Sequence, residues 1–194
     1  DPVRYISNHS SGKMGYAIAE ALVQRGAEVT LVSGRTALDK PEGVERVDVL
    51  SAEEMYEACV ERFQQMDGAV MCAAVADYTP AVVADEKLKK SDSDMSIALK
   101  RTKDIAAALG AQKGGRVLVG FAMETQHEME NAQSKLKRKN FDFIVLNSLR
   151  KAGAGFRGDT NKVTLIDRNG NEEHPLMSKR DVADRIVDKI EKLL

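Results

Sequence analysis

The chain has 194 residues, and its 29 Lys and Arg residues nearly balance its 30 Asp and Glu residues, which leaves a formal net charge of −1. This length suits one domain, and 43% hydrophobic residues can bury a core, so a wholly disordered chain is excluded. The near-zero charge gives no general attraction to nucleic acids or anionic membranes, and 5% aromatic residues without tryptophan disfavour a protein that stacks single-stranded bases.

The cysteine content and the hydropathy are typical of a cytoplasmic protein. Cys59 and Cys72 are too few for a disulfide scaffold, and His and Cys residues show no zinc-ligand spacing. No apolar run approaches the roughly 20 residues that span a bilayer, and no signal peptide is visible. We expect a cytoplasmic location with reduced thiols, and neither nucleic-acid nor membrane partners.

The first half of the chain alternates short apolar runs with helical periodicity. Ser51 and Glu54 have the spacing of a capping box, which marks the start of one of the helices. The predicted elements are a strand at 3–6, a helix at 16–25, strands at 28–32 and 45–50, a helix from Ser51 to about 65, and an apolar buried strand at 68–74.

The second half continues the alternation and ends in a hairpin and a helix. Asn169-Gly170 between two alternating runs is a strong hairpin signal, which predicts a hairpin extension over 161–176. Ser178 precedes a helix with Val182, Ile186 and Ile190 on one stripe. The other predicted elements are a strand at 95–99, a helix at 103–111 capped by Thr102, a strand at 116–123, a helix at 126–139 and a strand at 142–146.

This order predicts one α/β domain over residues 1–194, with a Rossmann-like, doubly wound and mostly parallel sheet, a C-terminal β-hairpin extension and a terminal helix. Ligands of such sheets bind beyond the carboxyl ends of the strands. The loops that we expect to carry function are therefore 7–15, 33–36, 73–80, 120–125 and 147–160.

The first of these loops resembles a phosphate loop without matching one. It has neither G-x-x-x-x-G-K-[ST] nor G-x-G-x-x-G spacing, but Gly12 and Gly15 allow the backbone to approach an anion at a helix start. The Asn8 amide can donate to a carbonyl or oxyanion. The alternative is a plain helix cap with Ser10 or Ser11 as the N-cap residue.

Two groups of lysines could supply the positive charge of a polyphosphate-binding site. Lys87 lies with Lys89 and Lys90 on a charged, irregular segment, and Lys135 and Lys139 are four residues apart on one predicted helix. The alternative for both groups is a solvated surface, and a basic helix end is favourable on its own because of the helix dipole.

The start of the next helix and the residues after the 68–74 strand each have a functional and a purely structural interpretation. The start of the 103–111 helix offers N–H groups to a base or phosphate, or is simply capped by Thr102. Asp77 follows a buried strand and can bind a ribose hydroxyl, a divalent cation or a turn N–H. Cys72 is expected to pack in the core.

Taken together, several segments resemble a known family. DPVRYISNHSSGKMGYAIAEAL, CAAVADYTP, EKLKK, GFAMET and VLN follow the order and spacing of bacterial phosphopantothenoylcysteine synthetase. The resemblance implies a ligase that joins 4′-phosphopantothenate to L-cysteine with CTP and Mg²⁺, through an acyl-cytidylate, in coenzyme A biosynthesis. It also implies a homodimer, with the 162–175 hairpin as a possible interface element, and fusion to a flavin-dependent decarboxylase domain that holds FMN.

The resemblance also assigns roles to individual residues. Asn8 is similar to the residue that turns the acyl-cytidylate into product, and Lys87 to the residue that forms that intermediate. Ser10, Ser11, Gly12 and Gly15 correspond to the substrate and phosphate loop, and Asp77 is the expected metal ligand. The expected CTP-binding residues are Met71, Cys72, Ala73, Asp77, Lys87, Lys103, Asp104, Ile105, Ala106, Phe121, Lys135 and Lys139.

The sequence departs from that family at two places. Family members often have Pro where this chain has Lys103, so a main-chain contact is expected there. They also carry a strand and a glycine-rich turn ahead of the DPVR segment, so we expect a first strand upstream of residue 1, without which the sheet has an unpaired edge.

Two other functions are compatible with the same fold. An NADP-dependent oxidoreductase would place Arg35, after the second strand, on a 2′-phosphate, although the chain lacks G-x-G-x-x-G. A non-catalytic nucleotide sensor would bind CTP without turnover.

Overall fold

The computed structural model describes residues 1–90, 94–124, 126–148 and 158–194. Its main sheet has five strands in the order β10-β9-β7-β6-β3. Strands β3 (Gly68–Met71), β6 (Val117–Glu124) and β7 (Phe143–Ser148) are parallel. Strand β9 (Val163–Asp167) pairs antiparallel with β7, and β10 (Asn171–Glu173) pairs antiparallel with β9. The predicted α/β fold with a mostly parallel sheet is confirmed.

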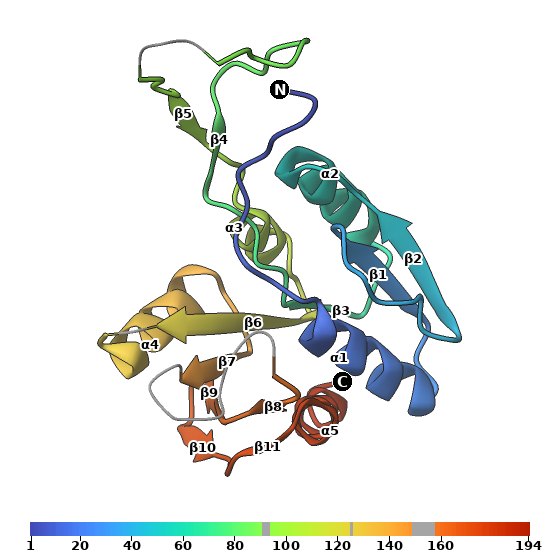
Figure 1. Ribbon diagram of the computed structural model, residues 1–194. Helices are drawn as coiled ribbons and strands as arrows, with labels where there is room; N and C mark the ends of the chain where they lie inside the picture. The colour runs from blue at the N-terminus through green and yellow to red at the C-terminus, as the bar shows by residue number, and fades with distance from the viewer. Residues whose placement is uncertain (91–93, 125, 149–157) are drawn as a thin grey trace.

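Helices cover both faces of this sheet (Figure 1). The alternation along β6 shows why, because Val117 and Val119 pack toward one core and Leu118 and Ala122 toward the other. The first core contains α1 (Lys13–Gln24) and α5 (Lys179–Glu191). The second contains α2 (Ala52–Phe63), α3 (Ile105–Ala111) and α4 (Glu128–Arg138).

A separate parallel pair is formed by β1 (Val29–Ser33) and β2 (Val44–Asp48). Helix α1 contacts this pair and also packs against α5 in the core of the main sheet. Among the described strands, β1 pairs only with β2 and β3 only with β6, so each has one unpaired edge.

Three local predictions are wrong. Residues 3–6 form no strand, and Val3 and Tyr5 are exposed, because none of the described strands pairs with this segment. The strand expected at 95–99 lies at Leu99–Arg101 instead, as β5. The run at 68–74 leaves the sheet after Met71, where the polar loop begins.

Two predicted helix starts also differ. Helix α1 begins at Lys13 with Gly12 as its N-cap residue, at a φ of 75°, and neither Ser10 nor Ser11 caps it. Helix α3 is capped by Asp104, whose side chain accepts the Ala107 N–H, rather than by Thr102. The caps expected at Ser51 and Ser178 are present and accept the N–H groups of the third residue that follows each of them.

The C-terminal hairpin forms as expected between β9 and β10. Its turn is closed by the Asp167 carboxylate, which accepts the N–H groups of Asn169 and Gly170 at 2.7 and 3.1 Å. A second antiparallel contact joins β8 (Thr160–Asn161) to β11 (Met177–Ser178), directly before α5. The predicted terminal helix is therefore anchored at its start.

An arm built on β4 (Tyr78–Pro80) and β5 extends away from the main sheet (Figure 1). The N-terminal segment lies beside it, because Arg4 Nη2 donates to the Leu88 carbonyl at 2.9 Å and the Leu88 N–H donates to Asp1. No helix among the described residues has the length and apolar character needed to cross a bilayer.

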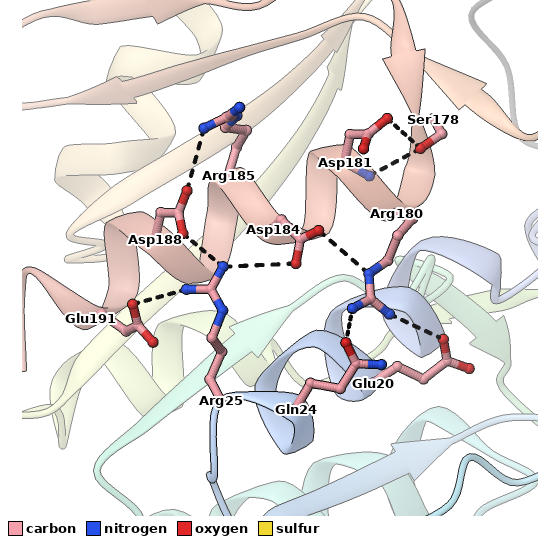
Figure 2. A network of polar contacts seen from close by, with 10 residues as sticks. All are labelled: Glu20, Gln24, Arg25, Ser178, Arg180, Asp181, Asp184, Arg185, Asp188 and Glu191. Atoms are coloured by element: carbon pink, nitrogen blue, oxygen red, sulfur yellow. Dashed lines mark hydrogen bonds and ion pairs between the residues drawn. The ribbon is translucent and has the colours of Figure 1, made fainter.

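Helices α1 and α5 are joined by a network of charged side chains (Figure 2). Arg25, at the end of α1, reaches Asp188 at 2.8 Å and Glu191 at 3.0 Å. Arg180, near the start of α5, contacts Glu20 and Asp184. These pairs fix the relative position of the two helices that cover one face of the sheet.

Replacing Arg25 tests this network. We expect Arg25→Ala to lower Tm by roughly 2 °C at low salt, because three acidic side chains of α5 lose their shared cation. The difference should shrink in about 1 M NaCl, where exposed charges are screened. Arg185→Ala is the matched control, since among the described residues Arg185 pairs only with Asp188 of its own helix. An Arg25→Ala effect no larger than the control, or independent of salt, would contradict the account.

Candidate functional site

Three segments meet beyond the carboxyl end of β3. The Asn8 Nδ2 group donates to the Val75 carbonyl at 3.2 Å, which ties the first loop to the segment after β3. Thr102 donates its hydroxyl to the Ala76 carbonyl at 2.8 Å and its N–H to the Asp77 carbonyl at 3.0 Å. The structure thus brings Asn8, the 72–77 segment and the start of α3 together.

The first loop turns tightly into α1. Ser10 Oγ accepts the Gly12 N–H at 3.3 Å, and Ser11 is half-buried. Gly15 lies against the end of β3, because a Cβ at this position would be 4.0 Å from Cys72 Sγ. The loop therefore lies beside both neighbouring loops at the same edge of the sheet.

The residues at the end of β3 offer no ionised or nucleophilic side chain to a ligand. Met71 is paired with Gly120 of β6, and Ala73 is exposed. Burial raises the pKa of the Cys72 thiol to about 12, so Cys72 is a neutral core residue at physiological pH. The predicted packing role of Cys72 agrees with this environment.

The start of α3 presents backbone rather than side chains. Ile105 is buried and Ala106 packs against the same core, so only their N–H groups, which lack helical partners, are available to a ligand. Lys103 turns toward α2, where it pairs with Glu53 and lies 4.9 Å from the centre of the Tyr56 ring. The hydrogen bond that Lys103 donates to the Glu53 carboxylate raises the pKa of Lys103.

Lys135 and Lys139 leave the same helix toward different partners. Lys135 Nζ donates to the Phe121 carbonyl on β6 at 2.7 Å, and Lys139 Nζ pairs with the Asp104 carboxylate. The close approach of α4 to α3 requires Gly110, because a Cβ there would lie 2.1 Å from the Lys139 carbonyl oxygen. Two ammonium groups are thus placed beside β6 and α3.

Lys87 is not brought to these residues. It is exposed on the segment between β4 and β5 and makes no hydrogen bond or ion pair with the residues that the structure describes. The adjacent Leu88 is held by Asp1 and Arg4. Within the expected ligand loops, residues 125 and 149–157 lie outside the described residues.

The described residues contain no group of three or more His, Cys, Asp or Glu side chains arranged to hold a metal ion. Asp77 is an exposed, single carboxylate at the strand end. This arrangement suits a cation such as Mg²⁺, which proteins often hold by one or two carboxylates while the phosphates of a substrate supply further oxygen ligands.

The sequence reasoning missed a charged cluster at the start of α1. Lys13 Nζ contacts Asp159 Oδ1 at 2.6 Å, and the hydrogen bond from Lys13 lowers the pKa of Asp159. Lys179 is buried beside them, and burial together with the Lys13 ammonium lowers its pKa. Lys13 and Asp159 are 146 residues apart, so no local pattern links them.

The comparisons with known proteins identify the family. A family model described as "DNA/pantothenate metabolism flavoprotein C-terminal domain" matches residues 1–194. The chain belongs to this family. It is 49% identical over 192 residues to the coenzyme A biosynthesis bifunctional protein CoaBC of Bacillus subtilis, covering 98% of this chain and 47% of that protein. It is also 51% identical over 193 residues to a cysteine/cysteine sulfinic acid decarboxylase of an unknown prokaryotic organism, covering 98% and 54%.

Solved structures agree with this assignment. The crystal structure of the C-terminal domain of CoaBC matches with a TM-score of 0.84 and 44% identity over 100% of this chain and 88% of that one. A Cab2 mutant in complex with phosphopantothenate-cysteine has the same fold, with a TM-score of 0.78 and 14% identity over 98% and 81%. The chain spans about half the length of the curated relatives it matches.

The Asp104–Lys139 pair predicts a pH-dependent stability. Burial acts to raise the pKa of Asp104, but the hydrogen bonds from Lys139 and the Ala107 N–H outweigh it and lower the pKa. A lowered carboxyl pKa stabilises the fold above the unfolded-state pKa, near 4, and this contribution is lost as the pH falls through the folded-state value.

We therefore expect Asp104→Asn, which retains a capping side chain, to lower Tm at about pH 7 and to approach the parent protein as the pH falls below about 4. Thermal melts between about pH 3 and pH 7 measure this, with the exposed Asp39→Asn as the control. A Tm difference that stays constant over this range would show that the charge on Asp104 does not contribute.

Proposed function

We propose that this protein is the ligase that joins 4′-phosphopantothenate to L-cysteine with CTP, through an acyl-cytidylate, giving 4′-phosphopantothenoyl-cysteine, CMP and pyrophosphate. The names of the CoaBC relatives and the phosphopantothenate-cysteine bound to the similarly folded Cab2 mutant support this reaction. The observation that carries the proposal is the contact of Asn8 with Val75, which places an amide donor between the glycine loop and the end of β3.

In the first half-reaction, a carboxylate oxygen of phosphopantothenate attacks the α-phosphorus of CTP. The bond to the bridging oxygen of the β-phosphate breaks, and pyrophosphate leaves with that electron pair. Such a step mainly needs positioning and neutralisation of charge. Lys135, beside β6, and Lys139, beside α3, would supply positive charge to the triphosphate, and Lys87 would join them from its exposed segment.

The nucleotide would be held largely by backbone. The 71–73 segment and the N–H groups at 103–106 lie at neighbouring strand and helix ends, and Phe121 offers an apolar surface nearby. Lys139 is bound to Asp104 without ligand, so a triphosphate would have to draw it from that carboxylate. Asp77 would share a Mg²⁺ ion with the phosphates, which would neutralise part of their charge.

In the second half-reaction, the uncharged cysteine amine attacks the acyl carbon, the bond between that carbon and the phosphate oxygen breaks, CMP leaves with the electron pair, and the amine proton passes to water. Negative charge develops on the acyl oxygen during this step. Asn8 is a neutral donor already oriented by its bond to the Val75 carbonyl, and its amide can stabilise that oxygen. No covalent intermediate on the protein is needed.

We further propose a homodimer formed through the arm. Exposed apolar side chains gather on this part of the chain, and a patch of this kind is commonly covered by a partner. The hairpin strand β10 is polar and exposed and offers no such surface. The apolar arm residues are Tyr78, Val82, Val83, Leu88, Met95, Ile97 and Leu99.

The biological setting is proposed from the relatives. Their bifunctional name supports fusion to a flavin-dependent decarboxylase domain, which would hold FMN, and a role in coenzyme A biosynthesis. The ligase would act in the cytoplasm, where Cys59 and Cys72 stay reduced.

Substitution of Lys87 tests the activation step. We expect Lys87→Gln to reduce pyrophosphate release from CTP and phosphopantothenate by roughly 100-fold, because the positive charge that Lys87 would supply to the phosphates in the transition state is lost. The control is Lys192→Gln, at the end of α5, which should retain the parent rate. Release at the parent rate by Lys87→Gln would remove Lys87 from the mechanism.

Substitution of Asn8 tests the transfer step. Asn8→Asp removes the amide donor, so activation should continue while transfer to cysteine slows, and the acyl-cytidylate should accumulate. Mass spectrometry of quenched reactions measures the intermediate, with Asn171→Asp on the exposed β10 as the control. Slower turnover without any accumulated intermediate would contradict the role proposed for Asn8.

A further inference from the structure

A cavity of about 530 Å³ lies between the first turn of α1 and the loop that follows β1. It opens beyond the carboxyl end of β1, next to the glycine loop. The ligase roles proposed above do not use the β1 side of this cavity; Arg35 has a role above only in the alternative oxidoreductase. Its lining residues are Ser10, Ser11, Lys13, Arg35, Thr36, Ala37 and Leu38.

The two walls of the cavity are fixed to each other. Gly12 has a φ of 75°, and a Cβ at this position would lie 2.7 Å from Thr36 Cγ2, so the loop after β1 packs directly on the turn before α1. The Thr36 hydroxyl donates to the Tyr16 hydroxyl at 3.1 Å and accepts the Leu38 N–H at 3.2 Å. The cavity is therefore shaped before any ligand binds, which reduces the entropy lost on binding.

Hydrogen bonds under the loop extend this support. The hydroxyls of Tyr16 and Ser33 are 3.2 Å apart in a buried contact, and Ser33 Oγ donates to the Gly34 carbonyl at 2.8 Å. This chain of hydroxyls runs from α1 through the end of β1 to the loop. Arg35 is thus carried by a backbone that is held on both sides.

The charge in the cavity is positive. Lys13 is paired with Asp159 at 2.6 Å, whereas Arg35 is exposed and makes no hydrogen bond or ion pair within the described part of the chain. A second cavity, of about 360 Å³ near the hairpin turn, has its lysines 113 and 189 matched by Asp142 and Asp167, and its Arg168 donates to the Asn140 side-chain oxygen at 3.2 Å. The guanidinium of Arg35 is a planar donor that suits the oxygens of a phosphate.

We propose that this cavity binds a phosphoryl group of a substrate, with Arg35 as its principal cation and the serine hydroxyls as further donors. The inference rests on the proposed ligase function, which offers two such groups. One is the β,γ-phosphate portion of CTP, which leaves as pyrophosphate, and the other is the 4′-phosphate of phosphopantothenate. The first is a phosphoric anhydride and the second a phosphate monoester, and both present anionic oxygens that Arg35 and the serine hydroxyls can bind in the same way.

Arg35→Ala tests this assignment, with Arg168→Ala, on the exposed hairpin turn, as the matched control. Loss of a charge-assisted hydrogen-bond pair is expected to raise the KM of the bound substrate roughly tenfold. If the cavity holds the CTP phosphates, the KM for CTP rises and binding of inorganic pyrophosphate, measured by calorimetry, weakens by a similar factor. If it holds the 4′-phosphate, the KM for phosphopantothenate rises and the preference for phosphopantothenate over pantothenate falls.

Either result supports the proposal, and Arg35→Lys should recover part of the loss. If Arg35→Ala keeps both KM values and the pyrophosphate affinity within twofold of the parent protein, as expected for Arg168→Ala, the proposal is wrong. If the parent protein forms no product from CTP, the ligase function fails by itself. Calorimetry of the parent and Arg35→Ala proteins with pyrophosphate and with phosphopantothenate still decides the cavity in that case.

Discussion

Burial of β6 and β7 on both faces is the constraint on which the rest of the structure depends. Adjacent residues of each strand point into different cores, with Phe143 and Val145 toward α1 and α5, and Ile144 and Leu146 toward the other helices. Both faces are therefore covered, and a ligand can reach the sheet only at its ends. The first loop, the segment after β3 and the start of α3 meet beyond the carboxyl end of β3, and the candidate site is built around their contacts.

Charge at this end is arranged mainly as pairs. Lys139 is held by Asp104, Lys103 by Glu53 and Lys13 by Asp159, while Arg35 and Lys87 face solvent. A near-neutral chain can thus carry a local group of cations, because the compensating carboxylates lie beside them. A net charge of −1 is therefore compatible with the triphosphate binding that we propose, in which the phosphates would replace these carboxylates.

The strong local signals of the sequence predicted the matching elements well. The capping box at Ser51, the Asn169-Gly170 turn and the cap at Ser178 depend on neighbours within a few residues, and all three are present. Predictions failed where distant partners decide. Thr102 is of a residue type that often caps helices. Its hydroxyl and N–H instead bind the carbonyls of residues 76 and 77, and Asp104 caps α3.

The same distinction applies to the candidate site. The loops were predictable, since the strand order places them at one edge, but the pairing of Lys13 with Asp159 and the cavity under Arg35 depend on contacts between remote segments. Lys87 remains a prediction, because no contact of its side chain connects it to the other residues in the part of the chain that is described.

The most direct test of the proposed ligase reaction is to measure pyrophosphate release from CTP, with and without phosphopantothenate and cysteine. The proposed mechanism predicts release that requires phosphopantothenate and Mg²⁺, with a stoichiometric acyl-cytidylate when cysteine is omitted and continuous turnover when it is added. Release that does not depend on phosphopantothenate, or no release until cysteine is present, would contradict the proposed order of activation and transfer.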